Sequence, residues 1–165
     1  MYKVIIVDDE ETVREGIRSL IHWEAEGFMI CAEGRDGKDG FKKIIEYQPY
    51  LVLIDIRMPG LNGLEVIKAA KERNCSSQFV ILTAYSEFDL ARTAITLGVK
   101  EYLVKPIDEE ELLQMVRCLK EELTSREQKH QFHCDNEERA RRELYRQILL
   151  NIGEREVWKS EMERY

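Results

Sequence analysis

Short apolar runs alternate with longer amphipathic stretches through the first 123 residues of the chain. Five of these runs have the length of strands, and most are rich in β-branched residues. They are Lys3 to Val7, Phe28 to Glu33, Leu51 to Ile54, Phe79 to Leu82 and Glu101 to Val104. Strands that alternate with helical patterns indicate βα units and a parallel sheet that is buried on both faces.

Five other stretches carry their apolar residues at helical spacing. They are Glu11 to His22, Lys38 to Tyr47, Leu64 to Arg73, Ser86 to Leu97 and a stretch that begins near Asp108. Ser86 and Asp108 suit helix N-caps, and Gly98 suits a helix stop. The pattern predicts an α/β protein of the (βα)5 type, with a flavodoxin-like, doubly wound parallel sheet.

The composition changes after Leu123. Thr124 to Glu143 is dominated by charged and amide residues, and strong helix formers continue to Tyr165 with a single glycine, Gly153. We therefore predict one domain over residues 1–123 and an extended helical segment over 124–165, which is either a linker or the start of a truncated output region. Both a coiled coil and a solvated connector helix fit this segment. His130, His133 and Cys134 fit a polar connector better than a metal site.

Charge and composition narrow the classes of protein further. Hydrophobic residues make up 44% and charged residues 35%, and no apolar run approaches the ~18 residues of a membrane span. The apolar N-terminus is too short for a signal peptide, so we expect a cytoplasmic protein. The net charge of -7 gives no broad basic surface, so contact with DNA would require sequence beyond this chain. The four cysteines are far apart and predict reduced thiols.

Polar side chains fall at the carboxyl ends of four predicted strands, where ligands bind in open α/β sheets. They are Asp8 and Asp9 after the first strand, Asp55 after the third, Thr83 after the fourth, and Lys105 with Pro106 after the fifth. Each has an ordinary explanation by itself, such as a helix cap, a turn residue or a solvated charge. Their joint placement at one rim favours a shared chemical role.

Crowded carboxylates repel one another unless a cation is present, and an all-oxygen site suits Mg²⁺ or Mn²⁺ better than zinc. With such an ion, Asp55 stays ionised and can act as a nucleophile on a phosphoryl group. The Lys105 ammonium would neutralise charge on the transferring oxygens, and Thr83 would donate a hydrogen bond to them. An acyl phosphate on Asp55 is labile, which suits a switch that must reset. The residues thus predict Asp55 as a phosphorylation site.

Several motifs, in this order and spacing, resemble the receiver domain of bacterial two-component response regulators over about residues 2 to 122. They are Val7 to Glu10, Asp55 to Gly60, Asn62-Gly63, Leu82 to Ala84 and Tyr102 to Pro106. The resemblance implies that Mg²⁺ is held by Asp9 directly, by Asp8 through water, by Asp55 and by the backbone carbonyl of Arg57. It also implies a cis Lys105-Pro106 bond. A receiver is a phosphoacceptor switch rather than an enzyme acting on an external substrate.

The resemblance also implies partners and a route for the signal. A sensor histidine kinase would supply the phosphoryl group, Thr83 would turn toward it, and Tyr102 would swing inward. These movements would bias a face that could form symmetric ion pairs in a phosphorylation-enhanced homodimer. The face comprises Arg92, Lys100, Glu101, Asp108 and Glu111. An ordinary solvated surface is the alternative for these charges. Arg57 and Tyr85 flank the site and could tune hydrolysis of the acyl phosphate.

The stretches Ile21 to Trp23, Gly27-Phe28 and Asp55 to Pro59 resemble the subgroup whose receivers precede an AraC-type DNA-binding domain. Two departures accompany this likeness. Tyr50 stands where the family usually has an aspartate, and no helix-turn-helix domain fits after residue 123. We therefore expect either a piece of a longer transcription regulator or a regulator whose output is the C-terminal helix.

Three other functions compete with this interpretation. Haloacid dehalogenase phosphatases need a second aspartate two residues after the nucleophile, where Arg57 stands here. A flavodoxin-like cofactor binder needs a phosphate loop after the first strand, and Asp8-Asp9-Glu10 would repel a phosphate. A stand-alone receiver or phosphorelay intermediate, acting through protein contacts only, stays open as the alternative to a transcription regulator.

Overall fold

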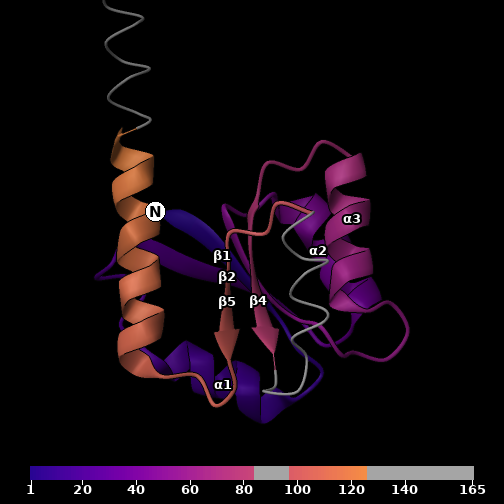
Figure 1. Cartoon of the computed structure of the whole chain (residues 1–165), viewed down its shortest axis with the longest axis horizontal. Coiled ribbons are helices and arrows are strands. Elements are labelled where there is room, and N and C mark those ends of the chain that lie inside the picture. Colours follow the sequence, from indigo (N-terminus) through magenta and orange to yellow (C-terminus); the bar gives the residue numbers. More distant parts are fainter. Residues whose placement is uncertain (84–96, 126–165) are drawn as a thin grey trace, which may run out of the picture. The chain divides into compact units, whose positions relative to one another are not determined.

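The structure, a computed structural model, describes residues 1–83 and 97–125 of the chain. Strands and helices alternate through residue 83, as Figure 1 shows. The elements are β1 (Tyr2–Val7), α1 (Glu11–Leu20), β2 (Phe28–Gly34), α2 (Gly37–Tyr47), β3 (Leu51–Asp55), α3 (Gly63–Glu72), β4 (Gln78–Thr83) and β5 (Glu101–Val104). A further helix begins at residue 109 and is described as far as residue 125.

The five strands form one sheet in the order β2-β1-β3-β4-β5, and every neighbouring pair is parallel. The chain moves outward from β1 to β2 and then crosses to β3 on the other side of β1, so the topology switches direction between β1 and β3. The predicted fold class is confirmed: this is a five-stranded, flavodoxin-like α/β sheet. This switch point lies at the carboxyl ends of β1 and β3, where such sheets bind ligands.

Both faces of the sheet are covered by helices, which is why the strand sequences are almost continuously apolar. On one face, Ile5, Val52 and Ile81 form a core cluster with Ile44 of α2 and Val66 of α3. The alternating strand positions point to the opposite face.

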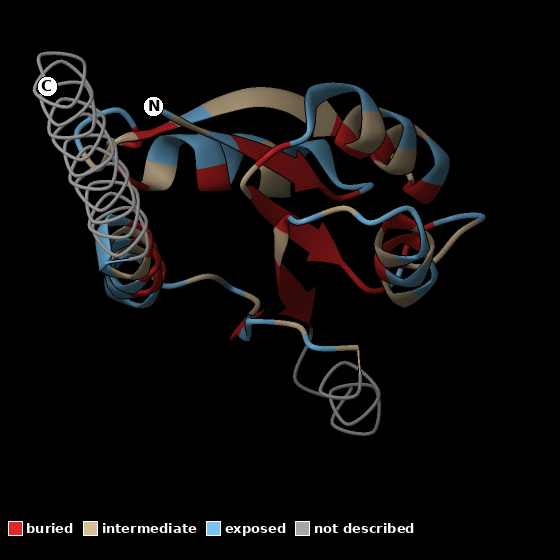
Figure 2. Ribbon diagram, turned by 90° about the horizontal axis from the view of Figure 1, so that it is seen from above, coloured by how far each residue is buried: buried red, intermediate tan, exposed pale blue. Residues whose placement is uncertain are grey.

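The opposite face also carries a buried core. Ile6, Leu53 and Leu82 are fully buried there. Figure 2 shows the inner strands of the sheet in the colour of buried residues. Burial of each such side chain contributes about 1.5–3 kcal/mol to folding.

The observed boundaries differ from the predicted ones by one or two residues. α1 ends at Leu20 instead of His22, because Ile21 already has an extended backbone (φ -131°, ψ 162°). The indole of Trp23 donates a hydrogen bond to the Ile17 carbonyl at 3.1 Å, so the chain folds back under the helix instead of continuing it. β3 includes Asp55 and β4 includes Thr83, so both polar side chains belong to the last positions of their strands.

Several predictions fall on residues outside the described ranges. These are the helix predicted from Ser86, with Tyr85 and Arg92, and the segment beyond residue 125 with His130, His133 and Cys134. The domain boundary near residue 124 therefore stays a prediction, while residues Met1–Lys120 form a compact unit. In the two described ranges, no helix is both long enough and apolar enough to span a membrane.

Helix α3 begins immediately beside the peptide that follows Asp55. Asn62 caps this helix in a capping box with Glu65, and the Gly63 amide donates to the Ile56 carbonyl at 2.9 Å. A Cβ atom on Gly63 would lie 2.2 Å from the carbonyl oxygen of Asp55. Only glycine therefore allows α3 to start so close to the end of β3.

We expect Gly63→Ala to lower the free energy of unfolding by about 2–3 kcal/mol, because the backbone of β3 must shift to admit the methyl group. Gly16 is the matched control, since a Cβ there meets nothing within 4 Å. Gly16→Ala should raise stability by about 0.5–1 kcal/mol, as expected for an unhindered helical position. Urea unfolding of both variants measures the difference, and equal stabilities would contradict the close approach.

Candidate functional site

The register of the sheet brings the ends of β1 and β3 to the same level. Val7 pairs with Ile54, so the next residues, Asp8 and Asp55, lie side by side at the carboxyl edge. On the other side of β3, Asp55 pairs with Leu82, and the Lys105 amide donates to the Thr83 carbonyl at 2.8 Å. The polar positions that the sequence places at separate strand ends are therefore gathered at one rim.

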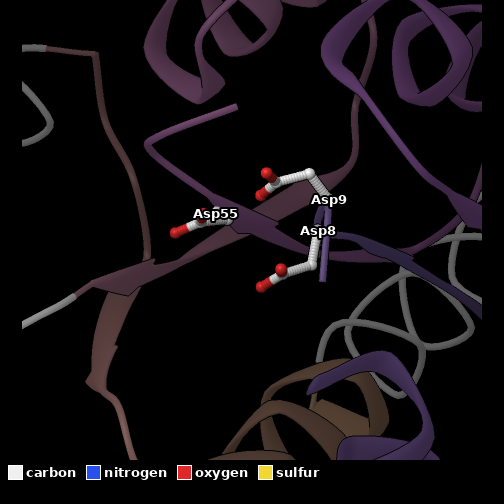
Figure 3. A group of neighbouring side chains, drawn as sticks. All are labelled: Asp8, Asp9 and Asp55. Carbon is white, nitrogen blue, oxygen red and sulfur yellow. The ribbon is translucent and has the colours of Figure 1, made fainter. Parts of the chain in front are cut away.

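Three carboxylates form an acidic cluster at this rim. Asp8, Asp9 and Asp55 each offer an oxygen atom, and these atoms lie within 4.8 Å of one another. Figure 3 shows the three carboxyl groups pointing to the same side, Asp8 and Asp9 from the end of β1 and Asp55 from β3. Asp8 is fully buried and Asp55 is 6% exposed, whereas Asp9 is exposed. The cluster thus has a buried floor and one carboxylate facing solvent.

Lys105 supplies a positive charge to the cluster. Its Nζ atom lies 2.7 Å from Oδ2 of Asp8 and 3.4 Å from Oδ1 of Asp55, with Oε1 of Glu10 at 3.8 Å. The side chain of Lys105 is 18% exposed, so water screens these ion pairs only partly. One ammonium therefore faces several carboxylates, which leaves the rim with a net negative charge.

The titration of Asp55 reflects this imbalance. Burial raises the pKa of the Asp55 carboxyl to about 6, Asp8 and Asp9 raise it as well, and the Lys105 ammonium opposes them. Partial burial of the ammonium lowers the pKa of Lys105, but the Asp8 and Asp55 carboxylates outweigh this effect and raise it above its ordinary value. Asp55 is consequently a carboxylate whose charge the metal-free protein stabilises poorly.

The remaining predicted residues lie around this cluster. Thr83 is buried at the end of β4, and Pro106 follows Lys105 through a cis peptide bond, which confirms that prediction. Tyr102 in β5 is 50% exposed. Arg57 is exposed in the loop after β3. The roles assigned to these side chains, and to the Arg57 carbonyl, stay predictions.

Two residues contact the site in ways that were not anticipated from the sequence. Glu10 approaches Lys105, and its backbone amide donates to Oδ1 of Asp8 at 2.9 Å. Arg14, on α1, donates from Nη1 to the backbone carbonyl of Asp8 at 2.7 Å. Position 14 looks in the sequence like an ordinary polar residue of an amphipathic helix, so only the tertiary structure reveals the contact.

The donor set fits a divalent cation. Oδ2 of Asp8 is buried and accepts no hydrogen bond of good geometry among the described residues, although the Lys105 ammonium is close to it. A buried carboxylate is costly unless its charge is compensated, and here the single Lys105 ammonium is shared with Asp55 and Glu10. All three side chains offer hard carboxylate oxygens, which Mg²⁺ and Mn²⁺ prefer. The acidic cluster can therefore hold such an ion.

The fold and the site together point to one class of protein. It is an α/β protein with a parallel sheet, whose switch point carries a cluster of aspartates suited to a cation and a lysine beside them. The chain belongs to the response regulator receiver domain family, whose family model matches residues 4–117. The matched region contains every residue of the acidic cluster together with Thr83 and Lys105.

Two curated relatives are similar to this chain over the same region. YesN of Bacillus subtilis, named as an uncharacterized transcriptional regulatory protein, is 36% identical over 123 residues, which are 74% of this chain and 33% of YesN. The transcriptional regulatory protein HptR of Staphylococcus aureus is 36% identical over 68% of this chain and 44% of its own length. The chain thus spans less than half the length of these two relatives.

A solved structure agrees with the sequence comparison. The receiver domain of AraT, a response regulator from Geobacillus stearothermophilus, has a TM-score of 0.73 and 35% sequence identity to this chain. The match covers 76% of this chain and 98% of that domain. The similarity therefore extends over a complete receiver domain.

Proposed function

We propose that this chain is the phosphoryl-accepting switch of a cytoplasmic two-component system, and that Asp55 takes the phosphoryl group from a sensor histidine kinase. The observation that carries the proposal is the position of the Asp55 carboxylate, which lies at a strand end between two other carboxylates and 3.4 Å from the Lys105 ammonium. A divalent cation could bind Asp55 together with its carboxylate neighbours, while Lys105 supplies a fixed positive charge beside it.

The chemistry follows from these neighbours. An Asp55 oxygen attacks phosphorus, a new O–P bond forms, and the bond from phosphorus to the donor's leaving group breaks. Lys105, already beside Asp55, then lies within reach of the transferred phosphoryl oxygens, and Thr83 at the end of β4 can donate its hydroxyl to them. Mg²⁺, bound by Asp8, Asp9 and Asp55, would neutralise negative charge on the carboxylates and on the phosphoryl group.

Phosphorylation adds nearly two negative charges at the rim, and we propose that the chain relays this change through protein contacts. The exposed Tyr102 is the side chain that would turn inward, and the charges of Lys100, Glu101, Asp108 and Glu111 would support a homodimer. Light scattering with and without beryllofluoride tests the dimer, and an unchanged mass would count against it. Control of transcription is supported by the names of YesN and HptR, which are both called transcriptional regulatory proteins, and binding of DNA through an output domain is part of the same proposal.

Incubation with acetyl phosphate and MgCl₂ tests the phosphoryl transfer, with intact mass as the readout. The chain should gain one phosphoryl group, the gain should disappear when a chelator removes the metal, and fragment masses should place it on the peptide that contains Asp55. A folded protein that gains nothing under any condition, or gains the group on a peptide without Asp55, would overturn the proposal.

A further inference from the structure

Arg14 connects the acidic cluster to the neighbouring strand β2. Its Nη1 donates to the Asp8 carbonyl at 2.7 Å, and its Nε donates to Oε2 of Glu33 at 3.1 Å. The Arg14 side chain is only 12% exposed, so both hydrogen bonds are shielded from water. A guanidinium presents its donors in a rigid plane, so the two contacts fix each other's direction.

The acceptor of the first contact is the peptide group between Asp8 and Asp9. Three other contacts hold this corner: the Asp8 amide donates to the Gly34 carbonyl at 3.0 Å, the Glu10 amide donates to Oδ1 of Asp8, and Lys105 approaches Oδ2. None of these three involves the Asp8 carbonyl, which is the atom that sets the plane of the peptide leading to Asp9. The contact from Arg14 is therefore the one among these four that holds the peptide leading to the exposed Asp9.

We propose that Arg14 is a positioning residue for the divalent-cation site, acting through the peptide between Asp8 and Asp9. The inference rests on the magnesium site of the proposed function. Arg14 touches neither the cation nor the phosphoryl group. It holds the backbone so that the Asp8 and Asp9 carboxylates converge on the same point as Asp55, and residues that orient metal ligands in this way commonly change metal affinity by about 10- to 100-fold.

The charge of Arg14, considered alone, predicts the opposite effect of its removal on the affinity for Mg²⁺. The Arg14 guanidinium contacts the backbone of Asp8 and would repel a cation bound by the Asp8 side chain, so removal of its charge alone would strengthen metal binding. Loss of the hydrogen bond to Asp8 would weaken metal binding, because Asp9 would sample other directions. The direction of the change in affinity therefore separates positioning from simple electrostatics.

Arg18 provides a matched control on the same helix. It is also an arginine, and it also pairs with Glu33, through Oε1, but this ion pair does not involve Asp8. If Arg14 acted only by bracing α1 against β2 through Glu33, loss of either arginine would affect the site in the same way.

The experiment titrates the full chain with MgCl₂ and follows backbone amide shifts by NMR, which reports the dissociation constant and the integrity of the fold together. Arg14→Gln should bind Mg²⁺ about tenfold more weakly, and Arg18→Gln should stay within about twofold of the wild type. Should Arg14→Gln fail to fold, Arg14→Lys keeps the charge but cannot make both contacts, and it should lose about threefold.

Three results would overturn the inference: unchanged affinity in the Arg14 variants, tighter binding by Arg14→Gln, or equal losses in the Arg14 and Arg18 variants. Failure of the proposed function looks different. If the wild type shows no Mg²⁺-dependent shifts, or if Asp9→Asn titrates like the wild type, then the cation site itself is wrong, irrespective of Arg14.

Discussion

Asp55→Asn is expected to abolish phosphoryl uptake from acetyl phosphate, with the initial rate falling by at least about a hundredfold, because an amide is not a nucleophile toward phosphorus. Asparagine has nearly the shape of aspartate, so the loss cannot be attributed to a cavity in the core. The measurement is intact mass against time at fixed acetyl phosphate and MgCl₂.

The neighbouring carboxylates are poor substitutes for Asp55. Asp8 is fully buried, its Oδ1 accepts from the Glu10 amide, and its Oδ2 lies against the Lys105 ammonium. Asp9 is exposed, and no ion pair between it and Lys105 occurs among the described residues. Asp55, by contrast, belongs to the cluster, has the Lys105 ammonium at 3.4 Å and keeps 6% of its surface exposed, so a phosphoryl donor can reach it.

Asp36→Asn is the matched control for this substitution. Asp36 caps α2 by accepting from the Asp39 amide at 2.8 Å, and asparagine caps helices about as well as aspartate. This variant should take up the phosphoryl group at the wild-type rate. Persistent uptake by Asp55→Asn, at a rate within a few fold of the control, would mean that another side chain is the acceptor.

The rim of the sheet could be predicted because parallel strands end at a common edge. Asp8, Asp55, Thr83 and Lys105 each follow an apolar run that is recognisable by length and composition, and the register then brings them together. Such local patterns fix which residues reach the edge without any knowledge of distances.

The parts that could not be predicted depend on contacts between distant segments. The role of Arg14 depends on how α1 lies against β1 and β2, and nothing in the sequence near position 14 indicates it. The end of α1 at Leu20 depends on Trp23 folding back to Ile17. Gly63 resembles part of a family motif, but the need for glycine comes from the carbonyl of Asp55. Tertiary packing decides each of these features.

The same Asp55→Asn variant should be more stable than the wild type when no metal is present. In the folded chain, burial and the nearby Asp8 and Asp9 raise the pKa of Asp55 to about 6, compared with an ordinary value of 3.8. Because its pKa is higher in the folded chain, Asp55 binds a proton more tightly there than in the unfolded chain, and protonation therefore favours folding. This contribution to the free energy of unfolding is fully present below pH 3.8 and is lost as the pH rises through 6. At neutral pH the folded wild type therefore carries a charge that the unfolded chain accommodates better.

Asparagine carries no charge in either state, so it removes this penalty. At pH 7.5 with a chelator, we expect the variant to exceed the wild type by about 2–3 kcal/mol in free energy of unfolding, and by about 1 kcal/mol at pH 4.5. Saturating MgCl₂ should close the gap at pH 7.5, because the ion binds the folded wild type and stabilises it by mass action.

Urea unfolding at both pH values, with and without MgCl₂, measures these differences, and Asp36→Asn again serves as the control. A variant that is no more stable than the wild type at pH 7.5 without metal would show that the Asp55 charge is well accommodated in the apo fold. The metal-free acidic cluster would then have no unfavourable charge for a bound cation to compensate. A gap that closes with Mg²⁺ would instead show that the sheet edge maintains an unfavourable arrangement of charges, which binding of the cation relieves.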